Sequence, residues 1–190
     1  MNRLFFICGA HTSGKTSILK YLQEKQIIDF NGNEIGKQLY YERKFTTEEQ
    51  GSEFENEVTE LELQRDFAIW NSKYKVPAVE TWHLGNLAYA MVRNPEQVAS
   101  LLLKIKNSPF INDAIGIWLR VSKENIQKRT KTFESNAIWA ADFYTKVDSK
   151  IELCIQLLNL SSNITVVDTN TNFVEVLQKV EKEIINHLKK

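Results

Sequence analysis

The sequence has little of what a secreted or membrane-spanning protein needs. Of its 190 residues only two are cysteines, Cys8 and Cys154, and both lie in apolar segments. A disulfide framework is therefore not expected, and two buried thiols in a reducing cytoplasm fit better. No apolar run approaches the roughly 20 residues that a membrane-spanning helix requires. The apolar opening is too short for a signal peptide and runs directly into a polar loop, so a cytoplasmic protein is predicted.

An excess of charge of either sign is also missing. Lys and Arg together number 24, as do Asp and Glu, so the formal net charge is zero. Proteins that bind nucleic acid polymers or anionic membranes usually carry a basic excess, so neither partner is expected. A small anionic ligand needs only local positive groups. There is no internal repeat, low-complexity tract or linker, and residues 1–190 are expected to form one domain; a homodimer is left open.

Apolar periodicity predicts strands that alternate with helices. Continuous apolar runs indicate buried strands, and apolar spacings of three and four indicate helices. The predicted strands are 4–8, 27–30, 75–80, 114–121 and 164–167. The predicted helices are 14–25, 34–43, 54–73, 83–106 with a break at Asn94-Pro95, one capped by Ser122, 137–160 and 172–188; the polar segment 44–53 is expected to be a mobile loop. This alternation predicts an α/β fold with a parallel sheet and helices on both faces.

The most specific motif is a phosphate-binding loop between the first strand and the first helix. It consists of Gly9, Ala10, His11, Thr12, Ser13, Gly14, Lys15 and Thr16, followed by Ser17. The two glycines allow backbone angles closed to other residues, so that successive N–H groups turn toward phosphate oxygens at a helix N-terminus. Lys15 supplies a cation to the β- and γ-phosphates of ATP, and Thr16 offers a hydroxyl to Mg²⁺.

Carboxylates at strand ends are candidates for the second half of such a site. Glu80 ends the third strand, where it would hold Mg²⁺ together with Thr16 or act as a base. Asp29 and Glu34 flank the end of the second strand, and either could bind a substrate hydroxyl, serve as a base, or simply be a solvated carboxylate of the turn. Asp168 ends the last strand and is expected to shape a base-binding loop that includes Asn170.

Cations and aromatic residues complete the set of candidates. Arg129 follows the fourth strand in a polar segment and is predicted to neutralise the transferred phosphoryl group from a short lid around 129–137. If the molecule that accepts the phosphoryl group is itself a monophosphate, Arg65 and Arg93 are candidates to bind its phosphate. For either residue alone, an ordinary arginine on a helix surface is the better interpretation. Trp82 is the preferred aromatic for an acceptor pocket, with His83, Tyr89 and Phe54 as weaker candidates.

The order of these features resembles the P-loop nucleoside and nucleotide kinases, in particular the thymidylate-kinase and deoxynucleoside-kinase branch. The segments that carry the resemblance are the phosphate loop, Glu80-Thr81-Trp82-His83, 117–124, the cations Arg129 and Lys131, and 142–147. The resemblance implies a three-layer P-loop NTPase fold, a five-stranded parallel sheet of order 2-3-1-4-5 and a short lid. The family carries an Arg where this sequence has Thr81, and nicotinamide-riboside-type kinases share the layout.

Two functional hypotheses follow. The first is a kinase that uses ATP and Mg²⁺ to phosphorylate a nucleoside, a nucleotide or a similar small acceptor, with Lys15, Glu80 and Arg129 as the catalytic residues. The second is a nucleotide-binding regulatory or switch protein with slow hydrolysis. The Thr at position 81 favours the second hypothesis, whereas the order of strands, loop and cations favours the first.

Overall fold

Five parallel strands form the centre of the molecule. The computed structural model describes residues 3–42, 48–131 and 137–189. Its strands are β1 (Phe5–Cys8), β2 (Phe30–Gly32), β3 (Pro77–Glu80), β4 (Ile115–Arg120) and β5 (Ile164–Asp168), in the spatial order β2-β3-β1-β4-β5. Every pairing is parallel. The predicted α/β fold and sheet order are confirmed.

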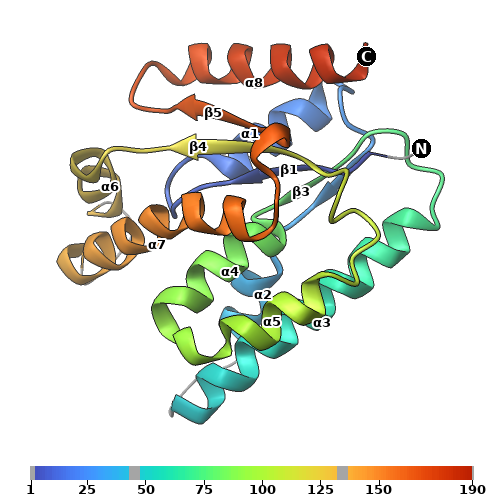
Figure 1. Ribbon diagram of the computed structural model, residues 1–190. Coiled ribbons are helices and arrows are strands. Elements are labelled where there is room, and N and C mark those ends of the chain that lie inside the picture. Colours follow the sequence, from blue (N-terminus) through green and yellow to red (C-terminus); the bar gives the residue numbers. More distant parts are fainter. Residues whose placement is uncertain (1–2, 43–47, 132–136, 190) are drawn as a thin grey trace.

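Helices cover both faces of this sheet (Figure 1). On one face lie α1 (Lys15–Glu24) and α8 (Phe173–Leu188), which contact each other. The opposite face carries α4 (Trp82–Arg93) and α7 (Ala137–Leu157), with α3 (Glu48–Trp70) and α5 (Val98–Ile105) packed outside α4. The remaining elements are α2 (Ile35–Glu42), α6 (Lys123–Thr130) and two short 3₁₀ helices, Pro95–Gln97 and Ser161–Asn163.

The alternation of side chains along β1 explains why the sheet is buried on both faces. Phe5 and Ile7 join the apolar cluster beneath α1 and α8, whereas Phe6 and Cys8 join the cluster beneath α4 and α7. Successive side chains of a strand point to opposite faces, so a continuous apolar run is what a doubly covered strand needs. Cys8 and Cys154 are both free and buried, as the sequence predicted.

Two predicted boundaries are wrong. The second strand is Phe30–Gly32 rather than 27–30, because the Asp29 carboxylate accepts the backbone N–H groups of Lys75 and Val76 and pairing with β3 begins one residue later. Helix α3 begins at Glu48, so the part of the predicted loop 44–53 from Glu48 onward is helical, and the Asn94 side chain donates to the carbonyl of Gly51 in its first turns. Residues 44–47 lie outside the described part of the chain.

Helix α3 buries three carboxyl side chains against its neighbours, at positions separated by seven and four residues on one face. Glu55 accepts from Arg93 at 2.6 Å. Glu62 pairs with Arg65 and accepts from Asn86 at 3.1 Å. Asp66 accepts from the indole of Trp82 and contacts the His83 ring. Buried carboxylates require such partners, so this long helix packs through polar as well as apolar contacts.

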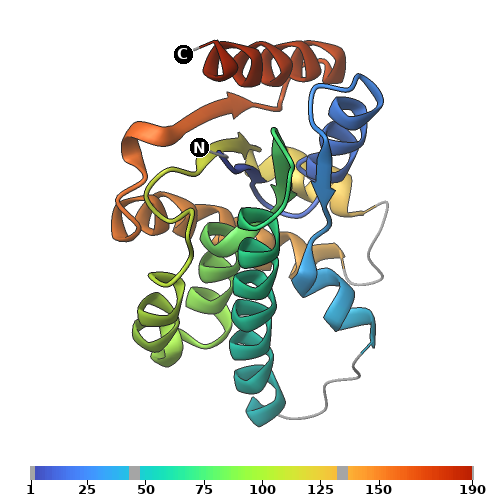
Figure 2. The same cartoon turned by 90° about the vertical axis from the view of Figure 1, so that its right-hand side faces the viewer.

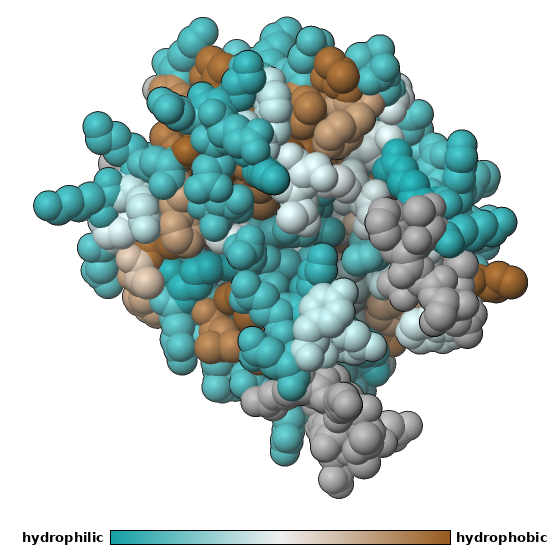
Figure 3. All heavy atoms as spheres, turned by 180° about the vertical axis from the view of Figure 1, so that it is seen from behind, coloured by the Kyte–Doolittle hydropathy of each residue, from teal (hydrophilic) through white to brown (hydrophobic). Residues whose placement is uncertain are grey.

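The outer surface is mixed in polarity. Figure 3 shows the face opposite to that of Figure 1, where apolar side chains form separate patches among hydrophilic ones. Figure 2 shows α3 extending along the side of the molecule below the sheet. None of the described helices is long and apolar enough to cross a membrane.

Candidate functional site

The phosphate loop is shaped by two glycines in backbone conformations that favour glycine. Gly9 has φ 145° and Gly14 has φ 102°. A Cβ atom on Gly9 would lie 2.5 Å from the carbonyl oxygen of Leu119, so a side chain there would also collide with β4. Helix α1 begins directly after Gly14, which places its free N–H groups at the end of the loop. The loop therefore has the geometry of an anion site.

Lys15 is held inside this loop. It is only 4% exposed, and its ammonium group donates to the carbonyls of Gly9 at 3.2 Å and Ala10 at 3.3 Å. The same ammonium lies 3.9 Å from a carboxylate oxygen of Glu80. These contacts orient a cation toward the place where phosphate oxygens would sit.

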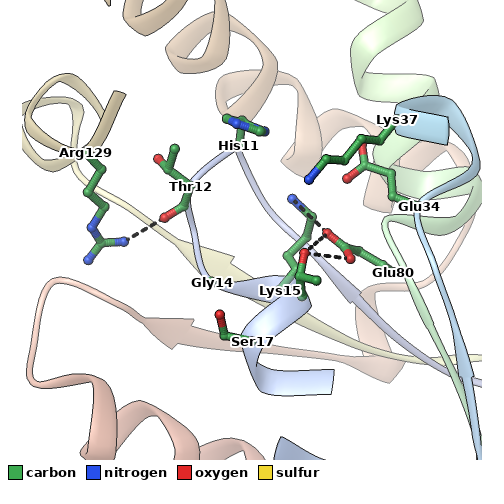
Figure 4. Close-up of a pocket in the computed structure, with 10 residues that line it drawn as sticks. His11, Thr12, Gly14, Lys15, Ser17, Glu34, Lys37, Glu80 and Arg129 are labelled. Atoms are coloured by element: carbon green, nitrogen blue, oxygen red, sulfur yellow. Dashed lines mark hydrogen bonds and ion pairs between the residues drawn. The ribbon is translucent and has the colours of Figure 1, made fainter. Parts of the chain in front are cut away.

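Glu80 reaches the loop from the end of β3, next to β1 in the sheet. Its two carboxylate oxygens lie 3.0 and 2.9 Å from the Thr16 hydroxyl (Figure 4). Burial raises the pKa of Glu80, and the nearby Glu34 carboxyl raises it further, while Lys15 and Thr16 act in the opposite direction. Two close carboxyls of this kind favour a shared proton or a cation between them.

Arg129 joins the loop to the end of β5. From the last turn of α6 its guanidinium donates to the carbonyl of Thr12 at 3.2 Å and to that of Thr169 at 2.6 Å. Asn170 lies beside this contact and fixes the loop after β5, because its side chain accepts from the Ser122 backbone N–H and donates to Asp168. Most of the predicted lid, residues 132–136, lies outside the described residues.

These residues enclose a first cavity of about 280 Å³, called here the phosphate-loop cavity. Figure 4 shows Lys15 and Glu80 on its floor, Arg129 on one side, and Glu34 and Lys37 extending into it from the α2 side. Its lining residues are His11, Thr12, Gly14, Lys15, Thr16, Ser17, Glu34, Lys37, Glu80 and Arg129. The structure thus brings together most of the predicted phosphate loop, the carboxylates Glu34 and Glu80, and Arg129. Asp29 does not line this cavity, because its carboxylate accepts from the backbone of Lys75 and Val76.

A second cavity of about 300 Å³, the aromatic cavity, adjoins the first. The two share His11, Glu34 and Lys37. The other residues that line it are Gly36, Tyr40, Tyr41, Phe54, Val58, Asn86, Tyr89, Arg93, Trp139, Phe143 and Tyr144. The ring of His11 stacks on Tyr144, and Trp139 stacks on Phe143, so aromatic surfaces form much of its wall.

Arg93 lies in the aromatic cavity, as the sequence suggested, but its charge is already paired. Its Nε–H donates to Glu55 at 2.6 Å, and its guanidinium carbon lies 5.2 Å from the ring centre of Phe54 and 5.1 Å from that of Tyr89. Glu55 is 2% exposed. Burial raises the pKa of Glu55, whereas the charge of Arg93 lowers it.

The prediction that Trp82 stacks on a nucleobase is wrong. Trp82 is fully buried, its ring lies 4.6 Å from that of Phe6, and its indole N–H donates to Asp66 at 3.0 Å. The chain turns sharply after β3, with φ 68° at Thr81 and 52° at Trp82, and this turn directs the indole into the core. His83 is buried beside it, also in contact with Asp66.

Arg65 also falls outside the cavities. Its guanidinium pairs with Glu62 and donates to the carbonyl of Asn33 at 3.0 Å, and it is not among the described residues that line either cavity. The structure therefore does not support Arg65 as a cation for an acceptor phosphate. Thr81, at the position where the sequence departs from the family, is fully buried and contributes no charge to the site.

Sequence reasoning missed Lys37 and most of the aromatic wall. Lys37 lies three residues after Glu34, and this spacing places the two on one side of α2. The wall combines residues of α2, α3, α4 and α7, which are separated by about a hundred positions and meet only through tertiary packing. Phe54 and Tyr89, rated below Trp82 from the sequence, do line the cavity.

The oxygen atoms beside Lys15 fit a hard divalent cation. Thr16 and Glu80 offer a hydroxyl and a carboxylate within hydrogen-bonding distance of each other, and Mg²⁺ prefers such oxygen ligands. Among the described residues no group of three or more His, Cys, Asp or Glu side chains could hold a metal ion. Mg²⁺ in nucleotide sites is usually held by one or two protein oxygens, substrate phosphates and water, so this sparse set suits it.

No protein-family model and no curated protein matches the chain. Solved structures do match. Thymidylate kinase from Candida albicans has a TM-score of 0.68 and 16% identity over 99% of this chain and 92% of that chain. Deoxyadenosine kinase from M. mycoides, with bound dCTP, has a TM-score of 0.68 and 12% identity over 96% of this chain and 99% of that chain.

Thymidylate kinase from Ehrlichia chaffeensis has a TM-score of 0.66 and 12% identity over 96% of this chain and 98% of that chain. The chain has the fold of these nucleotide and nucleoside kinases. Identities this low establish the fold alone. The resemblance that the sequence suggested is confirmed at that level, and the reaction depends on the site.

Proposed function

We propose that the protein is a phosphotransferase that uses ATP and Mg²⁺ and transfers the γ-phosphoryl group to a nucleoside, a nucleotide or a similar small acceptor. The observation that carries this proposal is the pair of adjoining cavities, which share His11, Glu34 and Lys37. A donor bound at the phosphate loop would direct its terminal phosphate toward this shared edge. An acceptor in the aromatic cavity would present its reacting oxygen at the same place.

The residues of the phosphate-loop cavity supply what phosphoryl transfer needs. The loop N–H groups and Lys15 bind the β- and γ-phosphates, and Arg129 neutralises charge on the transferred group. Thr16 and Glu80 would hold Mg²⁺, which supplies further charge neutralisation when it is bound. Catalysis then rests on positioning and on preorganised positive charge.

The runner-up function, a nucleotide switch with slow hydrolysis, needs only the phosphate-loop cavity. The aromatic cavity beside it favours a transferase, because a switch protein has no use for a concave acceptor site open to the terminal phosphate. The fold likeness to three kinase structures points in the same direction.

Release of ADP from ATP, measured with and without a panel of nucleosides and nucleoside monophosphates, tests the proposal. We expect at least one acceptor to raise the rate well above hydrolysis in its absence. Lys15→Ala should abolish the stimulated rate, and Lys20→Ala, an exposed position on the same helix, should preserve it. A slow release rate that no acceptor changes would support the switch protein instead.

A further inference from the structure

We propose that the acceptor presents a hydroxyl rather than a phosphate to the donor, so that the substrate class is a nucleoside and not a nucleoside monophosphate. This inference rests on the proposed phosphotransfer. It is drawn from the charges at the edge shared by the two cavities and from the pairing of the cations in the aromatic cavity.

A carboxylate lies at the edge shared by the two cavities, where the reacting oxygen must lie. Glu34 lines both cavities, and Figure 4 shows it extending from the α2 side toward Glu80. A monophosphate carries a charge of about −1.5 to −2 at neutral pH and would be repelled there. A hydroxyl is uncharged and can donate a hydrogen bond to a carboxylate.

The arginine that lines the aromatic cavity already has a charge partner. Arg93 is bonded to the buried Glu55 at 2.6 Å, and the rings of Phe54 and Tyr89 lie close to its guanidinium. Pulling Arg93 away would leave Glu55 buried without its charge partner, which is strongly unfavourable. The Arg93–Glu55 pair therefore has no net charge. It can form hydrogen bonds with the polar edge of an uncharged heterocycle.

The other cation, Lys37, extends toward the place where the donor phosphates would bind. It lines both cavities and extends in Figure 4 toward the same space as Lys15. The other basic side chain in the described lining of the aromatic cavity, Arg93, is paired with Glu55. Thr81, directly after Glu80, is buried and uncharged. Apart from Lys37, which extends toward the donor phosphates, the described lining residues offer no lysine or arginine without a carboxylate partner for an acceptor phosphate.

The same arrangement supplies the proton acceptor. The hydroxyl oxygen forms a bond to the γ-phosphorus while the bond from that phosphorus to the β–γ bridging oxygen breaks, and ADP leaves with the electron pair. The hydroxyl proton moves to the Glu34 carboxylate. Glu34 suits this role better than Glu80, which is bonded to Thr16 and close to Lys15.

The test compares nucleosides with their own 5′-monophosphates at matched base and sugar. We expect kcat/KM for the best nucleoside to exceed that for its monophosphate by at least about tenfold, because like charges in one site repel. Preference for the monophosphate would overturn the inference and leave phosphotransfer intact. Activity with neither class would overturn the proposed function and this inference with it.

Glu34→Gln provides an independent readout, with Glu42→Gln, an exposed position on the same helix, as its matched control. Loss of the proton acceptor should lower kcat with the nucleoside by about 10²- to 10⁴-fold at an unchanged KM for ATP. Removal of the negative charge should also shift the ratio of kcat/KM values toward the monophosphate. A variant with wild-type kcat and an unchanged ratio would overturn the role assigned to Glu34.

Discussion

The hydroxyl of Thr16 lies within 3.0 Å of both carboxylate oxygens of Glu80, across the boundary between α1 and β3. These residues are 64 positions apart, and the pairing of β1 with β3 brings them together. The contact connects the phosphate loop to the strand-end carboxylate without a mediating side chain. It is therefore the part of the site on which the proposed Mg²⁺ dependence rests.

Glu80→Gln should separate nucleotide binding from turnover. The amide keeps the shape of the side chain but loses the charge that a divalent cation needs, so kcat should fall by about 10²- to 10³-fold. A Mg²⁺ titration of acceptor-stimulated ADP release should show a weaker dependence than in the wild type. Glu24→Gln, exposed on α1, should match the wild type. An unaltered Mg²⁺ response in Glu80→Gln would rule out a metal role for this carboxylate.

Arg129→Ala should mainly affect the rate of transfer. The guanidinium bridges the carbonyls of Thr12 and Thr169 and lines the phosphate-loop cavity, and the proposed function gives it the role of neutralising the transferred group. An arginine in that role is worth about 10³-fold or more in kcat. Steady-state kinetics would measure the loss, with Lys128→Ala on the exposed side of α6 as control. A kcat equal to that of the control would mean that Arg129 only holds the two loops.

Trp82→Phe should reduce stability without changing acceptor affinity. Trp82 is buried and donates to Asp66, so its loss removes a hydrogen bond to a buried charge, which costs about 1–3 kcal/mol. Trp139→Phe is the matched comparison, because Trp139 is 63% exposed and lines the aromatic cavity. Denaturant unfolding should show a loss of stability in Trp82→Phe and little change in Trp139→Phe. The KM for the acceptor should rise in Trp139→Phe and stay unchanged in Trp82→Phe. A KM for the acceptor that rises in Trp82→Phe but not in Trp139→Phe would mean that Trp82 contributes to acceptor binding.

Glu62 should make stability depend on pH. Burial raises the pKa of Glu62 in the folded protein above its ordinary value of 4.5, while Arg65 acts against this shift. A carboxyl with a higher pKa in the folded state binds its proton more tightly there, so the free energy of unfolding falls as pH rises above the unfolded value. This loss should begin in the wild type as the pH rises above about 4.5 and should be smaller in Glu62→Gln.

Exposed Glu60, on the same helix, offers the control variant Glu60→Gln, which should follow the wild type. Unfolding by denaturant at several pH values would give the comparison. A free energy of unfolding that rises with pH in the wild type relative to Glu62→Gln would mean that Arg65 and Asn86 outweigh burial.

The donor half of the site was predictable because its chemistry is local. The phosphate loop occupies eight consecutive residues, and the period of the apolar residues places it between a strand and a helix. Glu80 follows from the rule that parallel strands end at the same edge of a sheet. Sheet order and layers likewise follow from the alternation of strands and helices together with the family resemblance.

The acceptor half depends on tertiary packing that sequence patterns do not record. Tyr144 reaches His11 only because α7 packs along the sheet beside the phosphate loop. The position of Trp82 follows from the backbone turn at Thr81 and Trp82, where two non-glycine residues have positive φ. The pattern of apolar residues does not indicate such a turn. The sequence therefore predicts Trp82, two residues after Glu80, in the acceptor pocket, whereas the structure places it in the core.

The fate of the γ-phosphoryl group is the most direct test of the account. ATP labelled at the γ-phosphorus would be incubated with the protein, Mg²⁺ and a nucleoside, and the products separated. We predict that the label appears in the phosphorylated nucleoside, that little appears as inorganic phosphate, and that Lys15→Ala transfers none. Label found only in inorganic phosphate, at a rate that no nucleoside or monophosphate changes, would contradict transfer between the two cavities.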